Sequence, residues 1–328
     1  MHDPVIIGAS VQLARNYPDL PFDLSAQDEA STLVIARTSA ALEDAGYALR
    51  LLREMSEDNR QTLAESGLIT RQLLAAEKTA AVLLPEKGPA TVMLGGENHV
   101  TIVSQGKSLA EASAACFAVD DRLSRRVRFA FDEELGYLAS QPSRIGTGMR
   151  AALRLHLPML VREKQLPEAR KAAEEAGALL YGLYPASGKP AGDVLEISNA
   201  MAQGRTEAEI TDLVEFAAKR LCDMEKELRM KAFKENPVRM KDRVCRALGI
   251  MKSAHLLGAD EFWRLWSDVR LGAEMELLPV RTAQVDALLP EAFPAHLRNW
   301  AQDSLAGEKL DGCRAVRVRE LLADVTLK

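Results

Sequence analysis

Three short apolar runs, close together between Lys78 and Gln105, constrain the fold of this chain more than any other feature. They read AAVLLP, ATVML and HVTIV, and the segments EKGP (86–89) and GG (95–96) separate them. Apolar runs of this length, bounded by Gly and Pro, are typical of strands joined by tight turns. The pattern therefore predicts an antiparallel meander in the first third of the chain.

Segments on both sides of this meander have helical character. Between Ala26 and Glu65, and again over residues 107–128, apolar residues recur at roughly helical spacing among polar ones. Further along, the sequence predicts a strand at 128–137, helix-like segments at 149–161 and 168–179, and a strand at 193–199.

The last third of the chain contains almost no strand signals. A long amphipathic helix is predicted to begin at Thr206, with Glu209 three residues later in a capping-box pattern, and helical patterns continue from about Leu221 to Lys328. A chain of 328 residues is long enough for two packed units. We predict an α+β domain at 1–222, followed by an all-helical domain at 223–328.

Composition excludes several functional classes. The net charge of −5 argues against a nucleic-acid-binding protein, which usually carries a basic excess. The four cysteines are scattered, without a CxxC pair or a nearby His, so neither a zinc site nor a disulfide framework is expected. The start has no leader-like pattern and no later run of 18 residues is free of charge, which predicts a cytoplasmic protein without a membrane segment.

Seven short motifs follow one another in a fixed order along the chain. They are LARN (13–16), ENH (97–99), AFDEELGYL (130–138), GTGMRA (146–151), HLP (156–158), EISN (196–199) and SDVRLG (267–272). Together they resemble bacterial protein-arginine kinases, in the ATP:guanidino phosphotransferase (phosphagen kinase) family, over nearly the whole chain. The resemblance implies a kinase-like domain with a curved antiparallel sheet flanked by helices, followed by a helical C-terminal domain.

The resemblance implies transfer of the γ-phosphoryl group of ATP to a guanidinium nitrogen. Such chemistry needs fixed cations that hold the triphosphate and stabilise the charge of the transition state. It also needs carboxylates that orient the guanidinium and accept its proton.

Most of the phosphate-binding arginines that the family motifs contain are replaced here. Ser10 and Gln12 stand where a first pair of arginines is expected, and Thr101 and Tyr181 stand at two further positions. Arg150, in GTGMR, is the one of the five that is retained. If each lost contact contributes about 1.5 to 3 kcal/mol, losing four weakens transition-state binding by roughly 6 to 12 kcal/mol.

The carboxylates of the family are only half retained. Glu97 matches one of the two guanidinium-facing acids, whereas Ala186 replaces the other. Asn98 replaces an acid associated with the magnesium shell, and Gln141 replaces a reactive cysteine. No metal site is expected from the other residues.

A C-terminal motif of the family, which binds phosphoarginine away from the active site, is partly retained. The segment LDGCRA keeps Asp311 and Arg314 but has Leu310 in place of the first arginine. On a helix, Asp311 and Arg314 would share a face, so they could bind the two ends of phosphoarginine. The alternative is an ordinary ion pair on a helix surface.

These replacements predict a degenerate relative with lost or very weak kinase activity, acting as a regulator, scaffold or phosphoarginine reader in protein quality control. The expected partners are a second copy of the chain, a zinc-finger activator and phosphoarginine-bearing proteins, with no cofactor. An active kinase that uses Mg-ATP through a rebuilt site is the alternative, with Arg144, Arg154 and Lys189 as candidate cations. A third hypothesis is an assembly subunit without a ligand.

Overall fold

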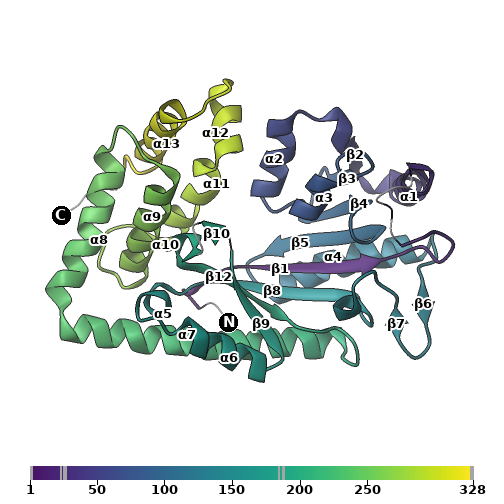
Figure 1. Cartoon of the computed structure of the whole chain (residues 1–328), viewed down its shortest axis with the longest axis horizontal. Coiled ribbons are helices and arrows are strands. Elements are labelled where there is room, and N and C mark those ends of the chain that lie inside the picture. The colour runs from purple at the N-terminus through teal and green to yellow at the C-terminus, as the bar shows by residue number, and fades with distance from the viewer. Residues whose placement is uncertain (1–2, 23, 25–27, 184, 187–188, 326–328) are drawn as a thin grey trace.

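A computed structural model of the chain describes residues 3–22, 24, 28–183, 185–186 and 189–325. Its centre is an eight-stranded antiparallel sheet with the order β2-β3-β4-β5-β1-β8-β12-β9. The α+β fold predicted from the sequence is confirmed (Figure 1). The strands of this sheet are β1 (Ile6–Arg15), β2 (Tyr47–Leu51), β3 (Ala81–Pro85), β4 (Ala90–Leu94), β5 (Val100–Gly106), β8 (Met149–His156), β9 (Ala178–Gly182) and β12 (Val194–Asn199).

Helices cover one face of the sheet. α4 (Leu109–Ser124) packs on β1 and β5, and α7 (Glu207–Glu235) packs on β8 and β12. Alternate residues of β1, such as Val11 and Leu13, point into this main core because strand side chains alternate between faces. The flanking helices on this side are α1 (Asp28–Ala41), α5 (Pro158–Arg162) and α6 (Leu166–Glu175).

The opposite face of the sheet is covered over part of its width. α2 (Glu57–Glu65) and α3 (Arg71–Ala75) lie at the β3–β4–β5 side, where Leu73 packs with Val82 and Val103 in a smaller core. Towards β1 and β8 this face carries polar residues. Two pairs of very short strands, β6 (Phe131–Asp132) with β7 (Gly136–Tyr137) and β10 (Pro185–Ala186) with β11 (Lys189–Pro190), lie outside the main sheet.

The C-terminal third is helical, as predicted. Its core packs around the fully buried Trp266 and extends to Val194 at the start of β12, so the two parts of the chain share contacts. α12 also packs against α2, where Glu65 accepts hydrogen bonds from the backbone of Ala295 and His296. The helices are α8 (Pro237–Ser253), α9 (Ala259–Glu274), α10 (Thr282–Asp286), α11 (Leu288–Ala292), α12 (Pro294–Ala301) and α13 (Glu308–Leu321).

The capping box of α7 is present, since the Thr206 hydroxyl accepts from the Glu209 backbone and the Glu209 carboxylate accepts from the Thr206 backbone. The boundary predicted between residues 222 and 223 falls inside this helix, which continues to Glu235. The division into 1–222 and 223–328 stays a prediction.

The structure corrects three expectations about local structure. The helical pattern from 26 to 65 is interrupted by β2, which follows Gly46 in the left-handed region (φ 67). The strand expected at 128–137 is the short β6–β7 hairpin, turned by Asp132, whose carboxylate accepts from two backbone amides. The helix-like stretch from 149 is the central strand β8, because pairing with β1 and β12 overrides the helical preference of its Ala, Leu and Arg residues.

Candidate functional site

The polar face of the sheet gathers residues that are far apart in the sequence. Gln12 on β1 lies directly opposite Arg150 on β8, and Ser10 lies opposite Ala152. On the other side of β1, Thr101 of β5 is paired with Ala14. Because alternate residues of paired strands share a face, the residues expected to replace phosphate-binding arginines lie on the face opposite α4 and α7.

The cavity beside Gln12 and Thr101 at this face is very small. It has a volume of about 30 Å³ and lies between β1, β5 and the loop that carries Glu97. Sites for small molecules usually have about 300 to 1,000 Å³, and one water occupies about 30 Å³ in the liquid. This cavity is therefore far too small for a nucleotide. Its lining is Gln12, Ala14, Thr70, Leu73, Met93, Gly96, Glu97, Asn98, Thr101 and Arg144.

Arg144 is the cation of this cavity. Its Nη2 donates to Oε1 of Gln12 at 2.9 Å, whereas its buried Nη1 has no hydrogen-bond partner. Burial, and then the nearby positive charge of Arg150, lower the pKa of Arg144 to about 9. Gln12 thus holds the Arg144 guanidinium beside this cavity.

Arg150 is engaged by a carboxylate that the sequence did not single out. Its Nη2 lies 2.7 Å from Oε1 of Glu196 on β12, and the Tyr181 hydroxyl donates to the same oxygen at 2.6 Å. The second oxygen of Glu196 lies 3.6 Å from Nε of Arg154. The retained arginine and two candidate residues therefore converge on one buried acid. An acid inside a buried strand was the available signal, because such acids are rarely unpaired.

Glu97 is exposed at the mouth of the small cavity. Its Oε2 accepts a hydrogen bond of 2.7 Å from the amide of Gln141, the residue that replaces the reactive cysteine. Asn98, beside it, is buried and accepts from the Asn16 side chain and the Ser140 backbone. Asn98 thus links three loops by hydrogen bonds. It lines the cavity, but its amide is neutral and brings no negative charge there.

Two candidates cannot be placed at this site by their side chains. Ala186 lies in β10 and Lys189 lies in β11. Their side chains are outside the described part of the structure, so the role of Lys189 as a substitute cation stays a prediction.

The glycines of the GTG motif fix the backbone beside Arg150. Gly148 has φ 71, and a Cβ atom there would lie 2.5 Å from the carbonyl oxygen of Ala14. Gly146 has φ 111 and lies against the backbone of Ala202. Both positions exclude a side chain, which supports the interpretation that this motif is retained for backbone geometry.

Asp311 and Arg314 meet on one face of α13, as their spacing predicts. Nη1 of Arg314 lies 2.7 Å from Oδ1 of Asp311, and it also donates to the carbonyl of Leu257 at 2.6 Å. Nε of Arg314 donates to the carbonyl of Ala292 at 3.0 Å. The side chain is almost fully buried, so Arg314 braces α13 against two other segments. Phosphoarginine binding by this pair stays a prediction.

Two larger cavities adjoin the helical C-terminal part. One of about 770 Å³ separates α2 and α3 from the C-terminal helices, with Glu65, Arg71 and Phe293 in its lining. The other, of about 800 Å³, lies where α5 and α6 approach α8 and α9. Across the described ranges, no group of three or more His, Cys, Asp or Glu side chains could hold a metal ion.

Two family models match this chain. The family model described as ATP:guanido phosphotransferase, C-terminal catalytic domain, matches residues 31–228. The chain belongs to this family. A second family model, described as the protein-arginine kinase McsB C-terminal domain, matches residues 237–328 of the same chain.

Relatives that match over nearly their whole length are named protein-arginine kinase. That of Moorella thermoacetica is 34% identical, covering 97% of this chain and 94% of the relative. That of Clostridium kluyveri is 32% identical, covering 97% of this chain and 95% of the relative. The resemblance to protein-arginine kinases found in the sequence is confirmed.

Solved structures of phosphagen kinases have the same fold. A duplicated taurocyamine kinase from Schistosoma mansoni, with bound transition state analog components, matches with a TM-score of 0.62 at 19% identity. The match covers 80% of this chain but only 38% of that protein. Lombricine kinase matches with a TM-score of 0.58 at 19% identity, covering 70% and 69% of the two chains. Within the described residues, no helix is long and apolar enough to cross a membrane.

Proposed function

We propose that this family member has lost ordinary phosphoryl transfer and acts as a regulator or scaffold among protein-arginine kinases, in the cytoplasm and in protein quality control. The observation that carries the proposal is the small cavity of about 30 Å³ beside Gln12 and Thr101, two of the four residues that stand in place of expected phosphate-binding arginines. A triphosphate needs room and several free cations, and the small cavity, with Arg144 as its basic residue, offers neither.

The ion pairs of the sheet face also support the proposal. Arg150, the retained arginine, is bound to Glu196, and Tyr181 fills a replaced position by donating to the same carboxylate. Glu196 would compete with a triphosphate for Arg150, because both are anions. Arg150 is thereby assigned a structural role.

A second candidate function is an active protein-arginine kinase with a rebuilt nucleotide site. Arg144 favours it, because one buried nitrogen has no partner and Arg150 lies close enough to lower its pKa. Two cations that repel each other would be stabilised by an anion between them. The name protein-arginine kinase, which both of the relatives described above carry, also favours this candidate.

Calorimetric titration of Mg-ATP into the chain and into Arg144→Met distinguishes the two candidates. Arg144 has no acidic partner within 4 Å in the described residues, so this variant is expected to fold, which circular dichroism checks. Equal affinities for the two proteins support the regulator, even if nucleotide binds elsewhere. A loss of ten-fold or more in Arg144→Met would identify a working site at the sheet face and support the kinase.

The role of a phosphoarginine reader is a finer form of the proposal. Its motif pair Asp311 and Arg314 is formed, but Arg314 is buried against backbone acceptors, which favours a structural role. Titration of free phosphoarginine into the chain and into Asp311→Asn tests it. Binding that Asp311→Asn weakens would support the reader, and no binding would leave the regulator or an assembly subunit without a ligand.

The proposed partners follow from the same family relationship. They are a second copy of the chain, a zinc-finger activator and proteins that carry phosphoarginine. Sedimentation of the purified chain over a range of concentrations tests self-association.

A further inference from the structure

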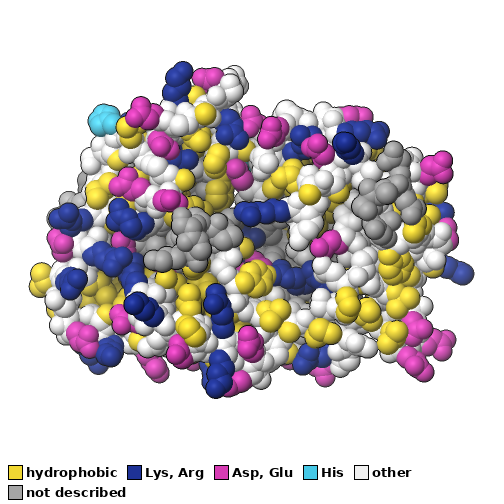
Figure 2. Space-filling view, in the orientation of Figure 1, with side chains coloured by type: hydrophobic (Ala, Val, Ile, Leu, Met, Phe, Trp, Pro, Cys, Tyr) yellow, Lys and Arg dark blue, Asp and Glu magenta, His cyan; other side chains and the backbone are white. Residues whose placement is uncertain are grey.

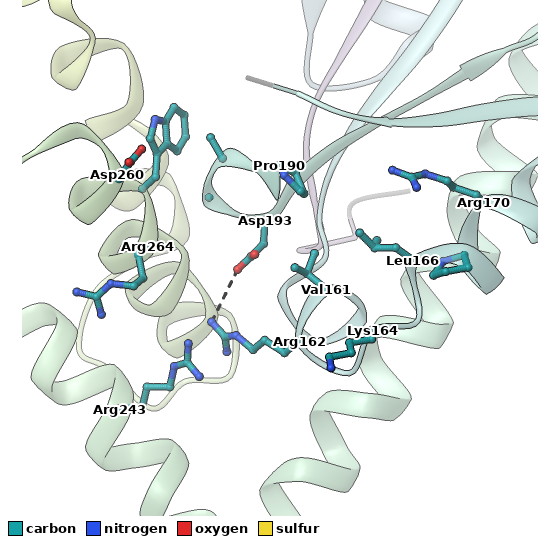
Figure 3. Close-up of a pocket in the computed structure, with 14 residues that line it drawn as sticks. Val161, Arg162, Lys164, Leu166, Arg170, Pro190, Asp193, Arg243, Asp260 and Arg264 are labelled. Carbon is teal, nitrogen blue, oxygen red and sulfur yellow. Dashed lines mark ion pairs between the residues drawn. The ribbon is translucent and has the colours of Figure 1, made fainter. Parts of the chain in front are cut away.

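A cavity of about 800 Å³ lies between the kinase-like part of the chain and the helical C-terminal part. Side chains of α5, α6, α8 and α9 surround it, and the turn η4 (Ala191–Asp193) closes one side (Figure 3). Its volume is in the range of sites for small molecules, which often form where two domains meet. None of the residues considered for the sheet face lines it.

The lining of this cavity is strongly basic. It contains five basic side chains against two acidic ones, Asp193 and Asp260, although the whole chain has a net charge of −5. Figure 2 shows Lys and Arg side chains over the region that α5, α6 and α8 occupy in Figure 1. Such a concentration of cations attracts anions. The basic residues are Arg162, Lys164, Arg170, Arg243 and Arg264.

Two of the arginines are held in place by a carboxylate outside the cavity lining. Oδ1 of Asp268 accepts from Nη2 of Arg162 at 2.5 Å and from Nε of Arg243 at 2.8 Å. The two guanidinium groups therefore converge, as Figure 3 shows. From Arg243, Asp268 accepts a hydrogen bond only from Nε, and the two Nη atoms of Arg243 form no hydrogen bond within the described ranges, so they can contact phosphate oxygens.

The acids of the cavity do not neutralise the remaining cations. Asp193 accepts from the Ser267 hydroxyl at 2.6 Å and lies 3.8 Å from Arg162. The side chains of Lys164 and Arg170 are exposed, and in the described ranges neither has an ion pair or a hydrogen bond. Two exposed cations are thus available beside the two arginines that Asp268 holds.

The backbone around the cavity is strained at two points. Lys164 has φ 58 and Asp193 has φ 55, and these are two of only four non-glycine residues with positive φ in the described chain. Backbone strain of this kind is concentrated at functional sites.

The other wall of the cavity is apolar and partly aromatic. Trp263 lines it together with Pro190 and Leu166. Indole rings stack with nucleobases, whose faces are flat and poorly hydrated. We propose that this cavity binds a nucleoside phosphate, with its phosphate at Arg162, Arg243, Lys164 and Arg170 and its base against the wall formed by Trp263. This site is separate from the sheet face and goes beyond the proposed function.

Adenosine monophosphate, titrated calorimetrically into the full chain, tests the proposal. The Lys164→Ala/Arg170→Ala double variant removes two cations whose side chains form no ion pair or hydrogen bond with the part of the chain that the structure describes, so its fold is expected to be intact. The matched control is Lys78→Ala/Arg50→Ala, which removes the same charges from exposed positions outside the cavity. Adenosine and inorganic phosphate are titrated in parallel to separate the two halves of the ligand.

We expect saturable binding of adenosine monophosphate that the double variant weakens at least ten-fold and the control changes less than two-fold. Inorganic phosphate should bind at least ten-fold more weakly, and adenosine should bind too weakly to saturate. Absence of adenosine monophosphate binding, equal loss in variant and control, or adenosine binding as tight as the monophosphate would each overturn the proposal.

Discussion

At the scale of single residues, Glu196 fixes the positions of the Arg150 and Tyr181 side chains. Its carboxylate is buried in β12, and one of its oxygens accepts hydrogen bonds from the guanidinium of Arg150 and the hydroxyl of Tyr181. A buried acid needs such partners, because an unpaired charge in the interior is costly. The retained arginine thus contributes to the fold whether or not it contacts a phosphate.

The variant Arg150→Met should lower the free energy of unfolding by about 2 kcal/mol, because it leaves Glu196 with weaker partners in a buried strand. Urea denaturation measures the change. Arg50→Met in the edge strand β2, where the arginine is exposed and has no recorded ion pair, should change it by less than about 0.5 kcal/mol. Equal losses in the two variants would show that the pair with Glu196 contributes little.

His156 predicts a pH dependence of stability. It is fully buried, and burial followed by the charges of Arg270 and Arg229 holds its pKa well below the ordinary value of 6.5. The unfolded chain therefore binds a proton near pH 6.5 that the folded chain rejects, so stability falls as the pH decreases below 6.5. The slope from this group is at most about 1.4 kcal/mol per pH unit.

Replacing this histidine should reduce that slope. In His156→Gln, urea denaturation between pH 7 and pH 5 should show a weaker loss of stability than in the wild type. His255→Gln, at an exposed position, serves as the control and should keep the wild-type slope. An unchanged slope in His156→Gln would mean that the buried imidazole accepts its proton in the folded protein.

At the scale of helices and strands, the sequence predicted elements with strong local signals. The β3–β4–β5 meander, α4, α6, β12 and the capping box of α7 are confirmed, because turn residues, helical spacing and caps act locally. β8 was missed because its residues favour a helix and only its neighbours make it a strand.

The candidate site was predictable only in part. Resemblance in the motifs identified Gln12, Thr101, Arg150 and Tyr181, which do lie on one sheet face. It did not identify Glu196 as their partner, nor the basic cavity at Arg162, because contacts between distant segments leave no local pattern in a single sequence.

The turn before β8 gives a prediction at this scale. Gly148→Ala places a Cβ atom 2.5 Å from the carbonyl oxygen of Ala14 and forces a side chain at φ 71, so it should cost about 3 kcal/mol. Gly204→Ala, at the same φ but with no atom within 4 Å, should cost about 1 kcal/mol. Thermal unfolding of both variants measures the difference, and similar values would contradict the close contact.

At the scale of the whole molecule, the kinase-like and helical parts are joined at several places. α7 runs continuously beneath the sheet, and on the other side α12 packs on α2 (Figure 1). Arg298 of α12 pairs with Asp58 of α2 at 2.5 Å, close to the carboxylate of Glu65 that caps α12. The helices α2 and α3 are thereby held over the sheet, where Leu73 and Thr70 help to fill the small cavity.

The central claim is that this filled sheet face cannot hold a triphosphate for transfer. The most direct measurement is the initial rate at which purified chain moves label from γ-labelled Mg-ATP to arginine side chains of a protein substrate. The Moorella thermoacetica protein-arginine kinase serves as the reference, and Glu97→Gln of the present chain serves as the background. The account predicts that wild type and Glu97→Gln give the same rate, at least a thousand-fold below the reference. A wild-type rate within ten-fold of the reference, abolished in Glu97→Gln, would contradict it.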